Sequence, residues 1–173
     1  MLWSKRSCLS LAIAVLCLAL AGCGFKPLHG RGAQAISAAD LDSVQIPILR
    51  DREGQLLTNF LSQAFNPDGR RAVTNYHLEI SLSSSKQDLG VRRDATATRT
   101  NLSYTANLVL REAVTNKQVF KGRSVTVVSY NILDARFATL AAEQDAIRRG
   151  TKALADNIKI RIAAFLASRK KKS

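Results

Sequence analysis

Residues 76–83 read YHLEISLS, and their apolar members alternate strictly with polar ones. Successive side chains of a β-strand point to opposite faces, so this alternation predicts a strand with one buried face. Residues 102–110, LSYTANLVL, repeat the pattern over a longer stretch. The polar segment 86–94 between them contains Gly90 and is predicted to be the loop or tip of a hairpin. A long hairpin therefore lies at the centre of the predicted fold.

Two further strands are predicted. Residues 119–130 are β-branched and aromatic but alternate imperfectly, which either a β-bulge or burial of both faces would explain. A tight connection at Thr115-Asn116 precedes them. Residues 44–49, VQIPIL, predict a short strand. Because Pro47 cannot donate a hydrogen bond, that strand should lie at an edge or be irregular.

Two amphipathic helices complete the pattern. Asp51 is a suitable N-cap for the first, whose apolar residues recur at helical spacing over 56–64 before the turn NPDG at 66–69. The second is predicted from Arg136 to Ala167, where apolar residues keep a spacing of three to four. Gly150 interrupts it, at a cost of about 1 kcal/mol relative to Ala.

The predicted order is thus strand, helix, three strands, helix. Each helix needs an apolar surface against its buried stripe, and a sheet with one apolar face provides it. We therefore predict an α+β fold: a two-layer sandwich with two helices packed on one face of a four-stranded mixed, mostly antiparallel sheet. This single domain is expected to occupy residues 44–173.

The N-terminal segment has the features of a bacterial lipoprotein signal. Lys5 and Arg6 precede the apolar run Leu11–Ala21, which is too short for a membrane-spanning helix of about 20 residues. The run ends in Leu-Ala-Gly-Cys at 20–23, which resembles a lipobox. Residues 1–22 are predicted to be the signal peptide, Cys23 the lipid-attachment residue, and residues 23–43 a lipidated tether. Since Gly rather than Asp follows Cys23, the periplasmic face of the outer membrane is favoured.

The charge of the chain is one-sided. It has 26 Lys and Arg against 13 Asp and Glu, a net charge of +13. Export excludes nucleic acid as the partner, which leaves the phosphates of phospholipids and lipopolysaccharide. Cys8 and Cys17 lie in the signal peptide, so the mature domain has no cysteine for a disulfide or a metal.

Catalytic chemistry is not indicated by any motif. The chain has 2 histidines, His29 in the tether and His77 on the polar face of a strand. The carboxylates are scattered, and neither a nucleophile elbow nor a phosphate-binding glycine loop occurs. We expect no enzyme activity, no cofactor and no metal site.

The basic residues that best suit a ligand lie at the predicted hairpin tip. Arginine donates bidentate hydrogen bonds to phosphate, and neighbours on a turn converge on one anion more easily than neighbours on a strand. Arg92 and Arg93, with Lys86 and Arg99 nearby, are therefore predicted to bind lipopolysaccharide. The alternative, that these residues only keep a loop soluble, remains open. The C-terminal basic residues 169–172 are expected to be a solvated chain end.

Two ends of the chain resemble a known family. Residues 23–30, CGFKPLHG, resemble the start of mature LptE-family lipopolysaccharide-assembly lipoproteins of the alphaproteobacterial type, apart from His29, where those members typically have Tyr. Residues 129–131 (SYN), 137–146 (FATLAAEQDA) and 154–165 resemble the last strand and final helix of that family. No motif matches at the arginines.

The resemblance implies a non-enzymatic role. Such proteins plug the outer-membrane β-barrel LptD in an expected 1:1 complex, assist its assembly, and bind lipopolysaccharide during delivery to the cell surface. Three alternatives stay open: an auxiliary lipoprotein of an ABC-type lipid transport system, a lipoprotein enzyme using His77, and an envelope lipoprotein without a ligand.

Overall fold

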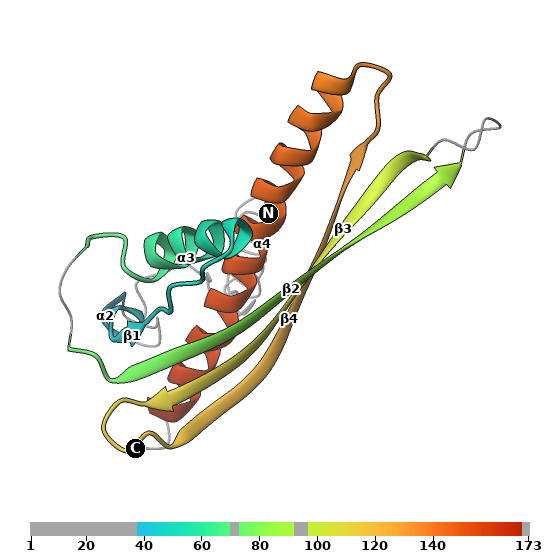
Figure 1. Cartoon of the computed structure of the whole chain (residues 1–173). Coiled ribbons are helices and arrows are strands. Elements are labelled where there is room, and N and C mark those ends of the chain that lie inside the picture. Colours follow the sequence, from blue (N-terminus) through green and yellow to red (C-terminus); the bar gives the residue numbers. More distant parts are fainter. Residues whose placement is uncertain (1–37, 70–72, 92–96, 171–173) are drawn as a thin grey trace, which may run out of the picture. The chain divides into compact units, whose positions relative to one another are not determined.

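A computed structural model describes residues 38–69, 73–91 and 97–170. Its helices and strands, in chain order, are α2 (Ala38–Asp42), β1 (Val44–Gln45), α3 (Arg52–Phe65), β2 (Tyr76–Val91), β3 (Ala97–Glu112), β4 (Gln118–Asn131) and α4 (Arg136–Lys170). The strands form one sheet in the order β1-β2-β3-β4. In Figure 1, α3 and α4 lie on the same side of this sheet. The fold is the predicted α+β sandwich.

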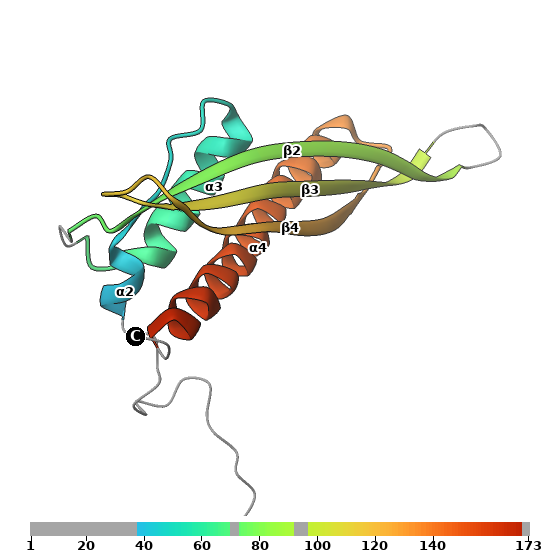
Figure 2. The same ribbon diagram turned by 90° about the horizontal axis from the view of Figure 1, so that it is seen from below.

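The sheet is mixed, as predicted. β1 pairs with β2 in parallel, whereas β2–β3 and β3–β4 are antiparallel. The strands β2 and β3 are longer than the alternation indicated, because residues 86–91, which were predicted to be a loop, continue β2. Backbone pairing with β3 extends the hairpin through these polar residues: Lys86 pairs with Leu102, and Val91 with Ala97. Figure 2 shows this hairpin reaching beyond the end of β4.

The register places the predicted apolar residues on one face. Leu78 pairs with Leu110 and Ile80 with Leu108, and all four face the helices. At the start of β4 the register shifts between Leu110 and Arg111, so the irregularity there is a bulge. Further along β4, Val125 and Val127 are about half exposed, at 48% and 56%. Burial of both faces therefore does not explain the imperfect alternation.

The first part of the domain departs from the prediction in two places. The strand at 44–49 is only Val44–Gln45, because Pro47 cannot continue a ladder. Thr58 of α3 holds the segment instead: its hydroxyl donates to the Pro47 carbonyl (3.1 Å) and accepts from the Leu49 amide (3.4 Å). The helix α2 lies at the end of the segment predicted to be a tether, and its Leu41 is buried.

The helix α3 begins as predicted. The Gly54 amide donates to the Asp51 carboxylate at 3.0 Å, which satisfies one of the free amides at the helix N-terminus. The long helix α4 has 35 residues and runs past the predicted end to Lys170. Among the described residues, no helix combines the length and apolar character needed to cross a membrane.

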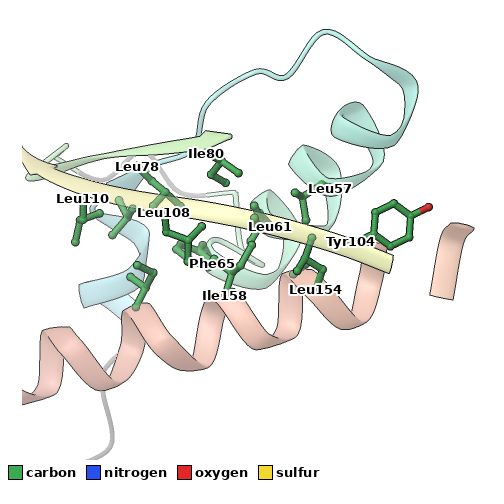
Figure 3. Packing of buried hydrophobic residues seen from close by; sticks show 14 of the residues in the cluster. Leu57, Leu61, Phe65, Leu78, Ile80, Tyr104, Leu108, Leu110, Leu154 and Ile158 are labelled. Carbon is green, nitrogen blue, oxygen red and sulfur yellow. The ribbon is translucent and has the colours of Figure 1, made fainter. Parts of the chain in front are cut away.

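The core lies between the sheet and the two long helices. Figure 3 shows side chains of α3, β2, β3 and α4 meeting there, with Tyr104 at one end of the cluster. The largest fully buried side chains include Tyr104, Phe65, Leu57, Leu61, Leu102, Leu108, Leu110, Leu154, Ile158 and Ile162. Burial of each such apolar side chain contributes roughly 1.5–3 kcal/mol before entropy is counted.

Gly150 has a packing role that its helix propensity does not indicate. A Cβ atom at this position would lie 2.7 Å from Cε2 of Tyr104 and 3.0 Å from Cγ2 of Val128. The missing side chain therefore lets α4 approach the sheet closely. The close packing of α4 against the sheet offsets the low helix propensity of glycine.

Candidate anion-binding site

The predicted ligand residues separate at the end of the hairpin. Lys86 on β2 pairs with Leu102 and so faces the helices, whereas Arg99 on β3 precedes the buried Thr100 and belongs to the opposite face. Arg92 and Arg93 lie outside the described residues, as does Cys23. The structure thus does not bring Lys86 and Arg99 onto one face.

Arg99 instead lines a groove where the end of β4 meets α4. The cavity has a volume of about 400 Å³. Its second arginine, Arg149 of α4, pairs with Asp145 at 2.7 Å, and both side chains remain more than half exposed. The groove is lined by Arg99, Ser129, Tyr130, Asn131, Leu133, Ala142, Asp145 and Arg149. It offers two guanidinium groups, hydroxyls and an amide to an anion, with one carboxylate present.

Exposed apolar side chains lie at the connection between β4 and α4 and in the first turns of α4. Phe137 is 89% exposed, and Leu133 and Leu140 are about half exposed. Leu133 also lines the groove. The connection between β4 and α4 is held by Thr139, whose hydroxyl accepts from the Leu133 amide (2.8 Å) and donates to its carbonyl (3.0 Å). We define the apolar patch as Ile132, Leu133, Phe137 and Leu140.

Lys86 is already paired. Its ammonium donates to the Glu143 carboxylate of α4, and this hydrogen bond is the main reason that the pKa of Lys86 lies above its ordinary value. Glu53 of α3 adds a weaker electrostatic contribution. The buried Tyr104 hydroxyl donates to Glu53 at 3.3 Å, and burial raises the pKa of Tyr104. The predicted lysine of the hairpin therefore lies opposite carboxylates of α3 and α4.

Of the C-terminal basic residues 169–172, Arg169 and Lys170 are more structured than predicted, whereas Lys171 and Lys172 lie outside the described residues. The Arg169 guanidinium pairs with Glu112 at 2.6 Å and lies over the Tyr76 ring, 5.9 Å from its centroid. Lys170 pairs with Asp40 of α2 at 3.4 Å. These contacts join the end of α4 to β3 and α2. Their sequence signal was only a run of charge, which does not specify a partner.

Groups that could ligate a metal do not gather in the described ranges. No cluster of three or more His, Cys, Asp or Glu side chains that could hold a metal occurs in residues 38–69, 73–91 and 97–170. His77 is exposed on β2. The groove at the end of β4 offers the guanidinium groups of Arg99 and Arg149, which are suited to binding an anion.

Comparison with known proteins identifies one family. The family described as "LptE: Lipopolysaccharide-assembly" matches residues 41–162, which cover most of the described domain. No curated protein sequence gives a significant match.

Several solved structures are similar. A candidate lipoprotein from Caulobacter crescentus CB15 has a TM-score of 0.62 and 26% identity, over 78% of this chain and 98% of its own. The rare lipoprotein B of Shewanella oneidensis has a TM-score of 0.55 and 12% identity, over 73% and 96%. A minor lipoprotein of Acinetobacter baumannii has a TM-score of 0.54 and 18% identity, over 70% and 88%. At these identities the last two show a shared fold alone.

Proposed function

Because the chain belongs to the LptE family of lipopolysaccharide-assembly proteins, we propose that it is a non-enzymatic outer-membrane lipoprotein that binds lipopolysaccharide and works inside the LptD barrel. In this role it plugs LptD, assists the assembly of the barrel, and takes part in delivering lipopolysaccharide to the cell surface. The single observation that carries the ligand assignment is the basic groove next to the apolar patch.

Lipopolysaccharide presents both of the chemistries that this surface accepts. Its lipid A carries phosphates, for which the guanidinium groups of Arg99 and Arg149 are suitable donors. Its acyl chains need an apolar surface, and exposed apolar patches on soluble domains commonly mark such binding sites. Leu133 lines the groove, and Phe137 and Leu140 are exposed in the first turns of α4. An amphiphile with an anionic head fits this combination better than a free anion does.

The hairpin connection supplies further cations to the same end of the sheet. Arg92 and Arg93 lie between Val91 and Ala97, the paired residues that close the hairpin. We propose that they contact the lipid A phosphates together with Arg99, and with Lys86 from the helix-facing side of the hairpin. Charge carried by several arginines would also compete with the divalent cations that hold lipopolysaccharide aggregates together.

The open face of the sheet supports the role as a plug. The side chains that face away from α3 and α4 include short hydroxyls and amides, such as Ser81, Ser83 and Ser103, and charged groups, such as Arg111, Lys121 and Arg123. The interior of an outer-membrane barrel is polar, so a face of polar and charged side chains is compatible with it. We propose an LptD complex of one copy each. Acylation of Cys23, after removal of residues 1–22, anchors the chain through the tether of residues 23–43, whose end forms α2.

Charge reversal tests the ligand assignment. Purified full-length acylated protein in detergent is titrated with fluorescent lipopolysaccharide, and Arg99→Glu and the pair Arg92→Glu and Arg93→Glu are compared with the wild type. We expect binding to weaken about tenfold or more in each, because an attractive contact becomes a repulsive one. Arg123→Glu, an equal charge change on β4 far from the groove, should bind normally. Equal affinity in all variants would remove this site.

Depletion tests the cellular role. Loss of the protein should lower both the lipopolysaccharide on the cell surface and the amount of correctly folded LptD. Normal levels of both would contradict the proposed function.

A further inference from the structure

Lys86, one of the residues proposed to bind lipid A phosphate, is held by a carboxylate in the structure. Its ammonium donates to Glu143, which lies on α4 across from β2. We propose that Glu143 sets the affinity of the site by competing with the ligand phosphate for Lys86. This inference rests on the proposed function, and it assigns to Glu143 a role in regulating that function.

Glu143 is fixed in place more firmly than Lys86. It lies one turn before Ala146 and two turns before Gly150, which are buried where α4 meets the sheet. The Glu143 side chain is 23% exposed, whereas that of Lys86 is 54% exposed. A lysine side chain is long and flexible, so the ammonium can turn toward a ligand in solvent while the carboxylate stays between helix and strand.

The surroundings of Lys86 explain why this exchange has an energetic cost. Glu53 of α3 also acts on Lys86, and Asp88 of β2 lies two residues along on the same face, where it accepts from the Thr100 hydroxyl at 2.7 Å. When Lys86 turns to a phosphate, Glu143 loses its partner and remains near other carboxylates. Binding is therefore weaker than the cations alone would give. A protein that delivers its ligand to another site benefits from this lower affinity.

Removal of the carboxylate tests the proposal. Full-length acylated protein in detergent is titrated with bis-phosphorylated lipid A, and Glu143→Gln is compared with the wild type. We expect the affinity to rise about 3- to 5-fold, because an exposed ion pair of this kind is worth up to about 1 kcal/mol. Asp156→Asn is the matched control: it removes one negative charge from the same helix by breaking the Lys152–Asp156 pair. It should leave the affinity unchanged.

A second substitution shows whether Glu143 acts through Lys86. Lys86→Met should weaken binding, and in that background Glu143→Gln should give no gain. The whole effect should also vanish with dephosphorylated lipid A, which separates recognition of the phosphates from recognition of the acyl chains. A gain that persists in the Lys86→Met background would show a general charge effect and overturn the proposal.

The outcomes distinguish this inference from the proposed function. If the wild type binds lipid A and Glu143→Gln binds it equally well, the regulatory role is wrong and the proposed function stands. If neither the wild type nor any variant binds lipid A, the proposed ligand itself is wrong, and the inference falls with it.

Discussion

Substitution of Gly150 by alanine should destabilise the protein, although alanine is the better helix former. In an exposed helix interior this change stabilises by about 1 kcal/mol. Here the new Cβ would lie 2.7 Å from Cε2 and 3.0 Å from Cδ2 of Tyr104, and 3.0 Å from Cγ2 of Val128. The Tyr104 ring is fully buried and its hydroxyl is bonded to Glu53, so it has little room to move.

The net effect follows from two opposed contributions. Overpacking in a core costs roughly 1–3 kcal/mol, and contacts with a buried ring belong in the upper part of that range. After subtraction of the helix-propensity gain, we expect the free energy of unfolding to fall by about 1–2 kcal/mol. For a chain of this size the melting temperature should then fall by roughly 3–6 °C.

Urea unfolding followed by circular dichroism measures this change. Ala164→Gly, at an exposed position of the same helix, calibrates the propensity contribution and should lower stability by about 1 kcal/mol. The background Tyr104→Leu removes the ring atoms, and in it Gly150→Ala should be less destabilising, because the contact with Val128 remains. If Gly150→Ala instead raises the stability of the wild type by the full propensity gain, the close approach of α4 to the sheet is wrong.

Two further predictions concern the helix start and the pH dependence. Asp51→Ala removes the acceptor of the Gly54 amide and should lower the free energy of unfolding by about 1 kcal/mol in the same urea titration. Asp51→Ser keeps a capping oxygen and should retain most of the wild-type stability. The pKa of Glu112 lies below its ordinary value of 4.5, first because Thr115 donates to the carboxylate and then because Arg169 does. A lowered carboxyl pKa stabilises the fold above the ordinary pKa, and this contribution is lost as the pH falls through the folded value. The stability difference between the wild type and Glu112→Gln should therefore shrink below about pH 4.5, and a difference independent of pH would contradict this contribution.

Much of the fold could be predicted because local patterns agree with one another. The alternation at 76–83 and 102–110 specifies which face of each strand is buried, and the helical spacing around Leu57 and Leu61 requires a partner for that face. The Asp51 cap marks a helix start by direct hydrogen bonding to nearby amides. These signals involve residues that are close together in the sequence, so they can be recognised without knowledge of the tertiary contacts.

The missed features depend on contacts between distant segments. The helix-facing positions of residues 86–91 are Lys86, Asp88 and Gly90, which carry no apolar signal, and pairing with β3 makes the segment a strand. The requirement for glycine at position 150 arises because the Tyr104 ring packs against it, and the local sequence does not indicate this contact.

The candidate site could likewise be predicted only in part. Basic residues at the hairpin could be identified, since their type and number are local facts. Their partners could not: Lys86 meets Glu143, 57 positions along the chain, and Arg99 shares a groove with Arg149. Helical packing against a twisted sheet decides these pairings, and charge alone does not encode it.

The most direct test of the account is the identity of the protein bound to the natively acylated chain. Tagged protein is extracted from the envelope in mild detergent, captured, and its companion quantified by mass spectrometry. We predict LptD in equal amount, together with a triacylated N-terminal Cys23. Recovery of an inner-membrane ABC transport complex without LptD, or of a chain that keeps residues 1–22 unprocessed, would contradict it.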